Sequence, residues 1–354
     1  MAKILLVLLV LIFSFSSFPM EAHASQPREV LYEHALSRAI SRDPAIVPLD
    51  RESRQAGARA RDITDEILAM TSIERDIADE LEGQRLMAIA ERNRLQRERQ
   101  QLILDAEIRL RGHISNIAAH ESNITMLEKT LTFRKNMLEQ VQMRFEHGMA
   151  SEVDVREAEL SVQQANVNLE SLALALENER QLLNRLIRQP VTANILVVYE
   201  IYDLPPVPDN LDRFIQQQIA REHNFLYWQE EVEIRRHEWQ RQLEDPTVDN
   251  RYMRLQHQLA ILERDMAERQ AEMTIRGALA EWDRLQEQKL ALEAALIQAQ
   301  TEYTDMLTRL EAGLVTQIQV DGMALAYQAA VAELSMHYYS LWVARLKIEQ
   351  AYAL

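Results

Sequence analysis

The sequence predicts an all-α protein, built of long antiparallel coiled-coil helical hairpins in two internal repeats, with one short strand region. Glycine numbers 7 and proline 9 in 354 residues, so few turns can interrupt the chain. Apolar residues recur at spacings of three, four and seven over long stretches, which is the period of a narrow coiled-coil seam. The second half of the chain repeats the plan of the first.

The first residues have the pattern of an export signal. Lys3 precedes an apolar run from Ile4 to Phe18, and Ala22-His23-Ala24 offers small residues for cleavage before Ser25. The run is shorter than the roughly 20 residues of a membrane-spanning helix. We therefore expect residues 1–24 to be a signal peptide and the protein to be exported to the periplasm or outer cell envelope. An uncleaved N-terminal anchor is the alternative.

The first half is expected to contain one short and two long helices. The short helix runs from Arg28 to Arg42 and stops at Asp43-Pro44, because a residue before proline disfavours helical geometry. Beyond Pro48 the chain is helix-prone as far as His147, and the long element is placed near residues 84–147. Its late heptad positions are Ile117, Ile124, Leu127, Leu131, Leu138, Val141 and Phe145.

A tight hairpin tip follows this helix. Gly148 suits the left-handed position after a helix end, and Ser151 can cap the next helix. The returning helix ends at Pro190, and its apolar heptad positions are Val162, Ala165, Leu169, Leu172, Leu176, Leu183 and Leu186.

Residues 191–210 are predicted to connect the halves. Asn194 to Leu204 is rich in β-branched and aromatic residues, which indicates a short strand. Pro205, Pro206 and Pro208 stiffen the link, and Asp209 can cap the helix that begins at Leu211.

The second half follows the same order of elements. Its expected parts are a helix at Leu211–Glu222, a helix at Asn224–Leu243, a turn at Glu244–Asn250 and a long helix at Arg251–Ala312. Gly313 closes the long helix, Thr316 caps the next one, and apolar residues from Val320 to Leu341 continue the seam.

An internal repeat relates the two tips. Arg144 to Leu160 aligns with Arg309 to Leu325 at a constant offset, with five identities: Arg144/Arg309, Glu146/Glu311, Gly148/Gly313, Val155/Val320 and Leu160/Leu325. The starts of the halves match as well, Leu31–Pro44 against Leu211–Asn224. A duplicated unit explains identity at both ends, and gives repeats at 25–190 and 211–354. The alternative is that two capped helical hairpins look alike by chance.

These residues resemble the TolC-type outer-membrane efflux protein family. The family's repeats open with a pattern seen here as Ala35-Leu36-x-x-Ala39…Asp43-Pro44. Its hairpin motif is seen as Arg144-Phe145…Gly148…Ala150-Ser151…Asp154-Val155. The resemblance implies a homotrimer whose four long helices per protomer form a twelve-helix tunnel with coiled-coil tips.

Two departures from the family pattern stand out. Gln319 occupies the aspartate position of the second tip, which puts an acidic ring from that repeat in doubt. The family also inserts β-hairpins between ascending and descending helices to build an outer-membrane barrel, whose strands need about 9–11 residues. Here the second half has only Glu244–Asn250 at that place, and the repeat offset puts the first-half turn near Leu81-Glu82-Gly83. We therefore expect no transmembrane barrel of its own.

Composition and spacing argue against catalysis and nucleic-acid binding. The net charge is −16 without a basic face, and there is no cysteine for a thiolate site. His113 and His120 lie seven residues apart, but spacing places no third metal ligand beside them. No phosphate-cradling glycine loop or nucleophile elbow occurs. We expect no enzyme activity, no cofactor and no metal.

Two functions remain open. The first is a conduit component in export, which docks through its tips onto a periplasmic adaptor protein of an inner-membrane pump. The second is a barrel-less coiled-coil scaffold of the cell envelope without transport activity. Matched tips favour the first, and the docking residues are expected to be Gly148, Met149, Ala150, Ser151, Asp154, Gly313, Leu314, Val315 and Thr316.

Overall fold

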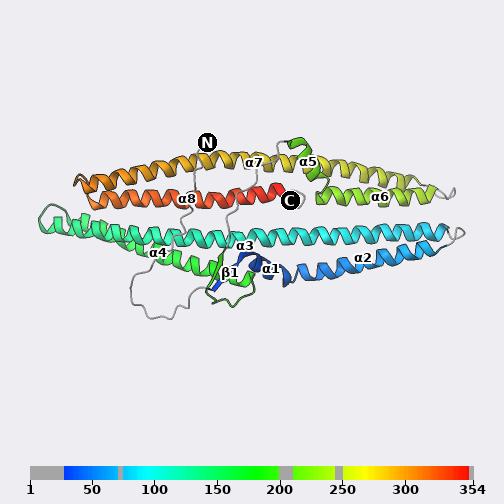
Figure 1. Cartoon of the computed structure of the whole chain (residues 1–354), viewed down its shortest axis with the longest axis horizontal. Coiled ribbons are helices and arrows are strands. Elements are labelled where there is room, and N and C mark those ends of the chain that lie inside the picture. Colours follow the sequence, from blue (N-terminus) through cyan, green and yellow to red (C-terminus); the bar gives the residue numbers. More distant parts are fainter. Residues whose placement is uncertain (1–27, 71–74, 199–209, 244–249, 351–354) are drawn as a thin grey trace, which may run out of the picture.

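The structure, a computed structural model, describes residues 28–70, 75–198, 210–243 and 250–350. Over these ranges the chain is an elongated stack of long helices with two short parallel strands, which confirms the predicted fold class (Figure 1). The predicted signal peptide at 1–24 lies outside the described residues. So do Asp209, the prolines of the connector, the strand region beyond Val198 and the turn residues 244–249.

Two helices, α3 (Arg75–Glu146) and α7 (Arg251–Glu311), run along the length of the molecule (Figure 1). At 1.5 Å per residue, the 72 residues of α3 span about 108 Å. Both helices had been predicted from their heptads, and α3 begins nine residues earlier than the predicted residue 84.

Shorter helices flank the two rods on either side of the middle. Toward one end α4 (Glu152–Leu186) packs on α3, and α8 (Gln317–Glu349) packs on α7. Toward the other end α2 (Ile46–Ala69) packs on α3, and α6 (His223–Leu243) packs on α7. Contacts of α3 with α8 and α6 join the halves, so that α7 forms one edge of the molecule and α2 with α4 form the other (Figure 1).

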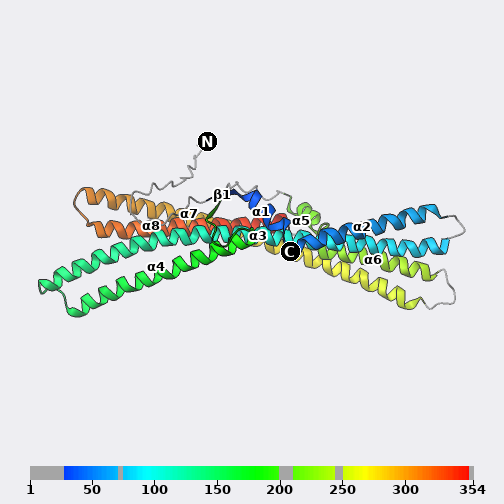
Figure 2. The ribbon, with the colours of Figure 1, turned by 90° about the horizontal axis from the view of Figure 1, so that it is seen from below.

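The middle of the molecule carries the short elements. Strand β1 (Arg28–Leu31) pairs in parallel with β2 (Ile195–Val198), with Val30 opposite Val197. Helix α1 (Tyr32–Ser41) lies beside this strand pair, and α5 (Leu211–Ile219) lies against α7 (Figure 2).

Fully buried side chains gather in this middle region. One apolar cluster joins β1, α1, α3, α4 and β2 through Val30, Ala35, Leu110, Ile114, Leu183, Ile187 and Val197. A second joins α5, α7 and α8 through Ile215, Ile219, Ala271, Ile275, Leu279, Trp282, Leu285, Leu341, Ala344 and Ile348. Leu104 of α3 and Leu346 of α8 connect the two halves.

Residues 28–31 correct one sequence expectation. They were expected to start the first helix, but they form β1, and the helix begins at Tyr32. Val30 and Val197 are both buried in the first apolar cluster, so pairing with β2 buries side chains that a helix would not bring together. The predicted strand at 194–204 is present where the structure describes it, at Ile195–Val198.

The expected turn near Leu81-Glu82-Gly83 is also wrong. These residues lie inside α3, and α2 and α3 are separated instead between Ala69 and Arg75. Gly83 continues α3, where an added Cβ would lie 3.4 Å from the His237 ring of α6, an ordinary contact distance. An isolated glycine is tolerated inside a long helix, because it costs only about 1 kcal/mol relative to alanine.

Helix ends differ from the sequence reading in three further places. Asn210 caps α5, since its side chain accepts a hydrogen bond from the Arg213 N–H at 3.0 Å. Helix α5 ends at Ile219 rather than at Glu222. Helix α4 ends at Leu186, before Pro190, where Arg188 takes a φ of 56°.

The two hairpin tips close with the same backbone motif. Gly148 and Gly313 both have φ of 71°, the left-handed conformation that glycine adopts without penalty. At the first tip, Gly148 N–H donates to Phe145 O at 2.9 Å and Met149 N–H to Arg144 O at 2.7 Å. At the second, the equivalent bonds are Gly313 to Leu310 and Leu314 to Arg309, each 2.9 Å. Both are Schellman helix ends.

Leu110→Ala tests the burial of the first cluster. Leu110 is fully buried on α3, so the change leaves a cavity and we expect the free energy of unfolding to fall by about 2–5 kcal/mol. Leu211→Ala on α5 is the matched control, because Leu211 is 45% exposed. Urea titration measures both. Equal effects of the two substitutions would contradict the position of the cluster.

Gly313→Ala and Gly277→Ala test the tip backbone on a single helix. The first forces alanine into a left-handed conformation and should destabilise by about 1–2 kcal/mol. Gly277 lies inside α7 with nothing within 4 Å of an added Cβ, so its replacement should stabilise by about 0.5–1 kcal/mol. Thermal unfolding reports the signs, and the same sign at both positions would contradict the tip geometry.

Candidate interaction site at the hairpin tips

The tip residues expected from the sequence come together at one end of the molecule. The α3–α4 and α7–α8 turns both lie at the end far from the α2–α3 and α6–α7 connections (Figure 2). The two sets, residues 148–154 and 313–316, therefore belong to one terminal surface, although they are about 165 positions apart in the sequence.

A reciprocal cap orders the first tip. The carboxylate of Asp154 accepts from the Ser151 N–H at 2.7 Å and from the Ser151 hydroxyl at 2.9 Å. The Asp154 N–H donates back to the Ser151 hydroxyl oxygen at 3.2 Å. The backbone and side-chain hydrogen bonds from Ser151 lower the pKa of Asp154. The tip thus holds an ionised carboxylate at the N-terminus of α4, where the helix dipole also favours it.

The second tip has the same geometry without the charge. Gln319 accepts from the Thr316 N–H at 2.9 Å and from the Thr316 hydroxyl at 3.3 Å. The amide oxygen of Gln319 thus occupies the place of the Asp154 carboxylate. This explains how the departure from the family pattern is tolerated: Gln319 preserves the cap, and only the first tip is acidic at this position.

Apolar side chains stand at the outermost point of both tips. Met149 is 62% exposed and Leu314 is 75% exposed. Ala150 and Val315, which follow them, are half-buried. Met149 and Leu314 occupy the position after the left-handed glycine, where a side chain often packs back on its own helix. Their high exposure leaves most of each side chain accessible to another molecule.

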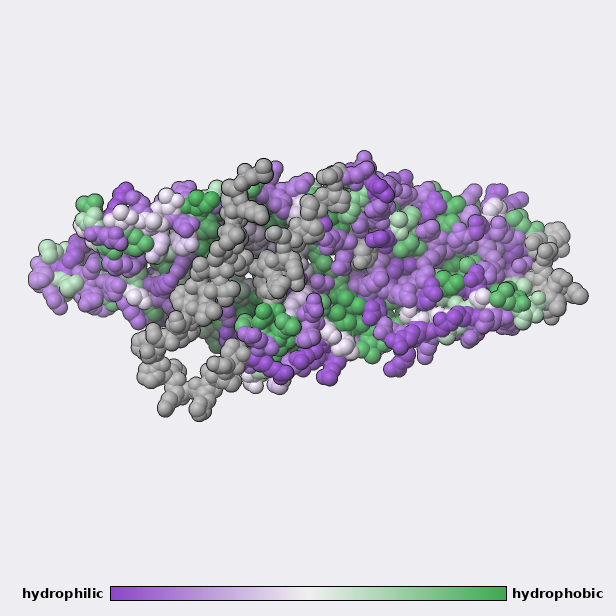
Figure 3. Space-filling view, viewed as in Figure 1, coloured by the Kyte–Doolittle hydropathy of each residue, from purple (hydrophilic) through white to green (hydrophobic). Residues whose placement is uncertain are grey.

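Apolar stripes lie exposed on the two edges, at residues that the sequence did not single out. On α7 they follow a heptad: Tyr252, Leu255, Leu259, Leu262, Met266 and Met273. On α4 they recur every seven residues: Val153, Leu160, Val167 and Leu174. Figure 3 shows such apolar patches separated by hydrophilic surface. A heptad pattern indicates a seam but does not say whether the partner helix belongs to the same chain.

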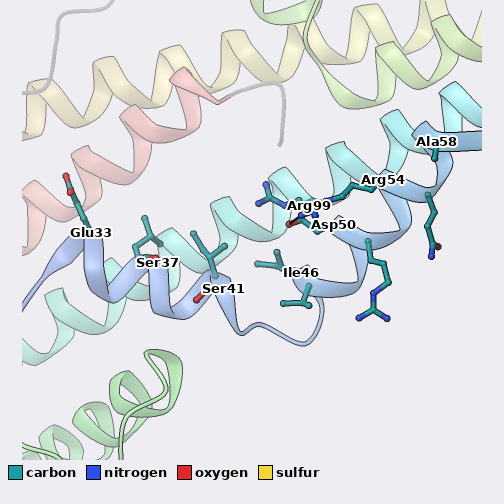
Figure 4. A pocket seen from close by; sticks show the side chains of 13 residues that line it. Glu33, Ser37, Ser41, Ile46, Asp50, Arg54, Ala58 and Arg99 are labelled. Atoms are coloured by element: carbon teal, nitrogen blue, oxygen red, sulfur yellow. Dashed lines mark ion pairs between the residues drawn. The ribbon is translucent and has the colours of Figure 1, made fainter. Parts of the chain in front are cut away.

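A groove of about 950 Å³ opens at the corner between α1 and α2 (Figure 4). Its apolar lining includes Leu36, Ile40, Ile46 and Val47. Asp50 and Arg99 form an ion pair of 2.7 Å at its wall. No sequence motif indicated it, because the residues come from three helices.

His113, one of the two histidines considered as metal ligands, takes part in an ordinary polar contact. His113 Nδ1 lies 2.8 Å from Glu179, which Asn116 also contacts at 2.9 Å. Burial acts to raise the pKa of Glu179, but these hydrogen bonds outweigh it and lower the pKa. Among the described residues, no three His, Asp or Glu side chains converge to hold a metal ion.

Within residues 28–70, 75–198, 210–243 and 250–350, no helix combines the length and apolar character needed to cross a bilayer.

Comparison by sequence finds no relative: no family model matches the chain, and no curated protein matches it. Comparison of structures finds several. The outer membrane protein VceC of Vibrio cholerae matches with a TM-score of 0.62 at 13% identity, over 91% of this chain and 95% of its own. A membrane protein of Pseudomonas aeruginosa matches with a TM-score of 0.65 at 12% identity, over 90% and 89%.

A third match is the CmeC outer membrane channel of Campylobacter jejuni, with a TM-score of 0.62 at 11% identity over 91% of this chain and 85% of that one. Sequence identities this low establish the fold alone. The chain thus has the fold of the TolC-type outer-membrane channel proteins over about nine-tenths of its length.

Proposed function

We propose that this protein is a component of a TolC-like export conduit, an exported homotrimer whose helices enclose a tunnel. Its hairpin tips dock onto a periplasmic adaptor protein that serves an inner-membrane pump. The observation that carries the proposal is the pair of matched tips on a channel-protein fold, each closed by a left-handed glycine and each ending in an exposed apolar side chain.

The tips support docking because their form serves no evident purpose within the chain. A turn that only reverses the chain direction has no need of Met149 or Leu314, which expose apolar surface to water. The internal caps, Ser151–Asp154 and Thr316–Gln319, fix the backbone of each tip before any partner arrives. A preorganised surface loses less conformational entropy on binding.

The edges support self-association. Apolar stripes lie exposed on α7 at one edge and on α4 at the other, so the two edges are different surfaces. Contacts between unlike surfaces join copies head to tail, and such contacts form a closed ring when the rotation closes. The proposal takes the number of copies in the ring as three, which is what the resemblance to the TolC-type family implies.

Replacing Met149 and Leu314 by serine tests docking. The proposal predicts that binding to a periplasmic adaptor protein from the same organism falls, because the apolar anchors are lost. The free energy of unfolding should stay within about 0.5 kcal/mol, as for other surface substitutions. Calorimetric titration and thermal unfolding measure the two effects.

The matched control replaces Met87 and Leu243 by serine at the opposite end of the molecule, where they are 49% and 51% exposed. This control should bind the adaptor normally. Unchanged binding by the tip variant, together with lost stability, would instead indicate that the apolar residues pack within their own turns. If neither variant, nor the unmodified protein, binds the adaptor, the result would favour the alternative function as a coiled-coil scaffold of the cell envelope.

Sedimentation velocity tests the trimer. Because the exposed stripes need partners, we expect the protein without residues 1–24 to sediment at about three times the chain mass at micromolar concentration; the full chain is 41.1 kDa. Leu174→Glu and Leu290→Glu place charges on the α4 and α7 stripes, at positions 73% and 66% exposed, and should shift the equilibrium toward monomer. A monomer in the unmodified protein contradicts the tunnel.

A further inference from the structure

We propose that the groove between α1 and α2 of one copy receives Met266, Arg269 and Met273 on α7 of a second copy. This inference rests on the self-association in the proposed function, and it places the contact between copies near the middle of the molecule.

The groove offers an apolar floor with carboxylates beside it. Leu36 and Ile40 of α1 face Ile46 and Val47 of α2, and Val47 is 43% exposed. Glu33 and Asp50 supply the carboxylates, as Figure 4 shows for the labelled side chains. An apolar surface of this kind, open at the edge of an elongated protomer, is stabilised when another helix covers it.

The stripe on α7 offers the matching surface. Met266 and Met273 are 52% and 60% exposed. Successive helical residues turn by about 100°, so Met273 points about 160° away from the buried residues Ala271 and Ile275. Its side chain is thus directed away from its own protomer. Methionine is flexible, which suits an irregular groove.

Arg269 and Glu33 carry opposite charges on the two surfaces. Arg269 lies between the two methionines and is exposed, which brings its guanidinium opposite Glu33 at the groove, whereas Asp50 is already paired with Arg99 at 2.7 Å and with Arg54 at 3.5 Å. On the outer rim, Arg51 and Arg54 are exposed on α2, and Glu268 and Glu272 flank the stripe on α7. Such an arrangement favours one register and one orientation of the two helices.

Contacts across the protomer place the two surfaces at one level along its length. Trp239 of α6 stacks on His257 of α7, with ring centroids 5.4 Å apart. The helices are antiparallel, so Glu230, nine residues before Trp239, lies level with Met266, nine residues after His257.

Contacts made by α3 show that the groove lies at this same level along the long axis. Glu230 binds Arg97 through two hydrogen bonds of 2.8 Å, and two residues further Arg99 pairs with Asp50 of the groove at 2.7 Å. Groove and stripe therefore occupy opposite edges without an offset along the long axis. Head-to-tail contacts without such an offset form a ring when the rotation between copies divides a full turn, whereas an offset would generate a helical filament.

Cysteine cross-linking tests this contact, because the chain contains no cysteine of its own. The variant carrying Val47→Cys and Met273→Cys should form intermolecular disulfides under mild oxidation, since the paired Cα atoms must lie within about 7 Å. Denaturing electrophoresis should show a ladder that ends at the closed ring. The matched control combines Val47→Cys with Leu290→Cys, which lies 17 residues or about 26 Å along the same helix and is 66% exposed.

A charge exchange provides a second test of the contact. Arg269→Glu should weaken self-association several-fold in sedimentation, and adding Glu33→Arg should restore it. Cross-linking of the control pair as readily as the Val47–Met273 pair overturns the inference. So does a trimer in sedimentation that gives no Val47–Met273 disulfide, and this result leaves the proposed function standing. A monomeric unmodified protein overturns both.

Discussion

The length of α3 and α7 is the constraint on which the rest of the structure depends. An amphipathic helix must bury its apolar stripe against another element, and a rod of 61 or 72 residues is far longer than a globular core is wide. Each rod is therefore covered by two shorter antiparallel helices laid end to end, α4 and α2 on α3, α8 and α6 on α7. Side-by-side packing of this kind always leaves two outer edges, and here both edges carry apolar residues. The fold and the proposed self-association thus follow from one cause.

The two large clusters of buried side chains lie where the flanking helices meet, and contacts in the middle of the molecule hold the two halves together. Arg111 of α3 lies between the ring of Tyr32 from the first half and the ring of Trp342 from the second, at 4.5 and 4.0 Å. Burial raises the pKa of Tyr32 to about 12, so its hydroxyl stays neutral beside Glu107. The Arg97–Glu230 pair adds a nearly buried charged contact between the halves. These contacts fix the halves relative to each other, which keeps the two tips on one terminal surface.

Local signals in the sequence were sufficient for the elements that depend on local chemistry. Heptads located α3 and α7, and Gly148, Gly313 and Ser151 located the tips with their caps. The predictions from the sequence were wrong where contacts between residues distant in the sequence determine the structure. Val30 joins a strand because Val197 lies beside it, and Gly83 stays helical within α3, which packs against α2 and α6. The groove at α1 and α2 was not predictable either, because its lining comes from three helices whose relative placement no heptad encodes.

The proposed tunnel requires that the rods α3 and α7 of several copies associate laterally around an open lumen. Small-angle X-ray scattering of the purified protein tests this most directly, because a hollow cylinder and a solid bundle of equal mass differ in their distance distributions. We predict the distribution of a hollow particle with a long dimension set by α3, about 108 Å. The distribution of a filled rod, or of a single extended protomer, would contradict the claim.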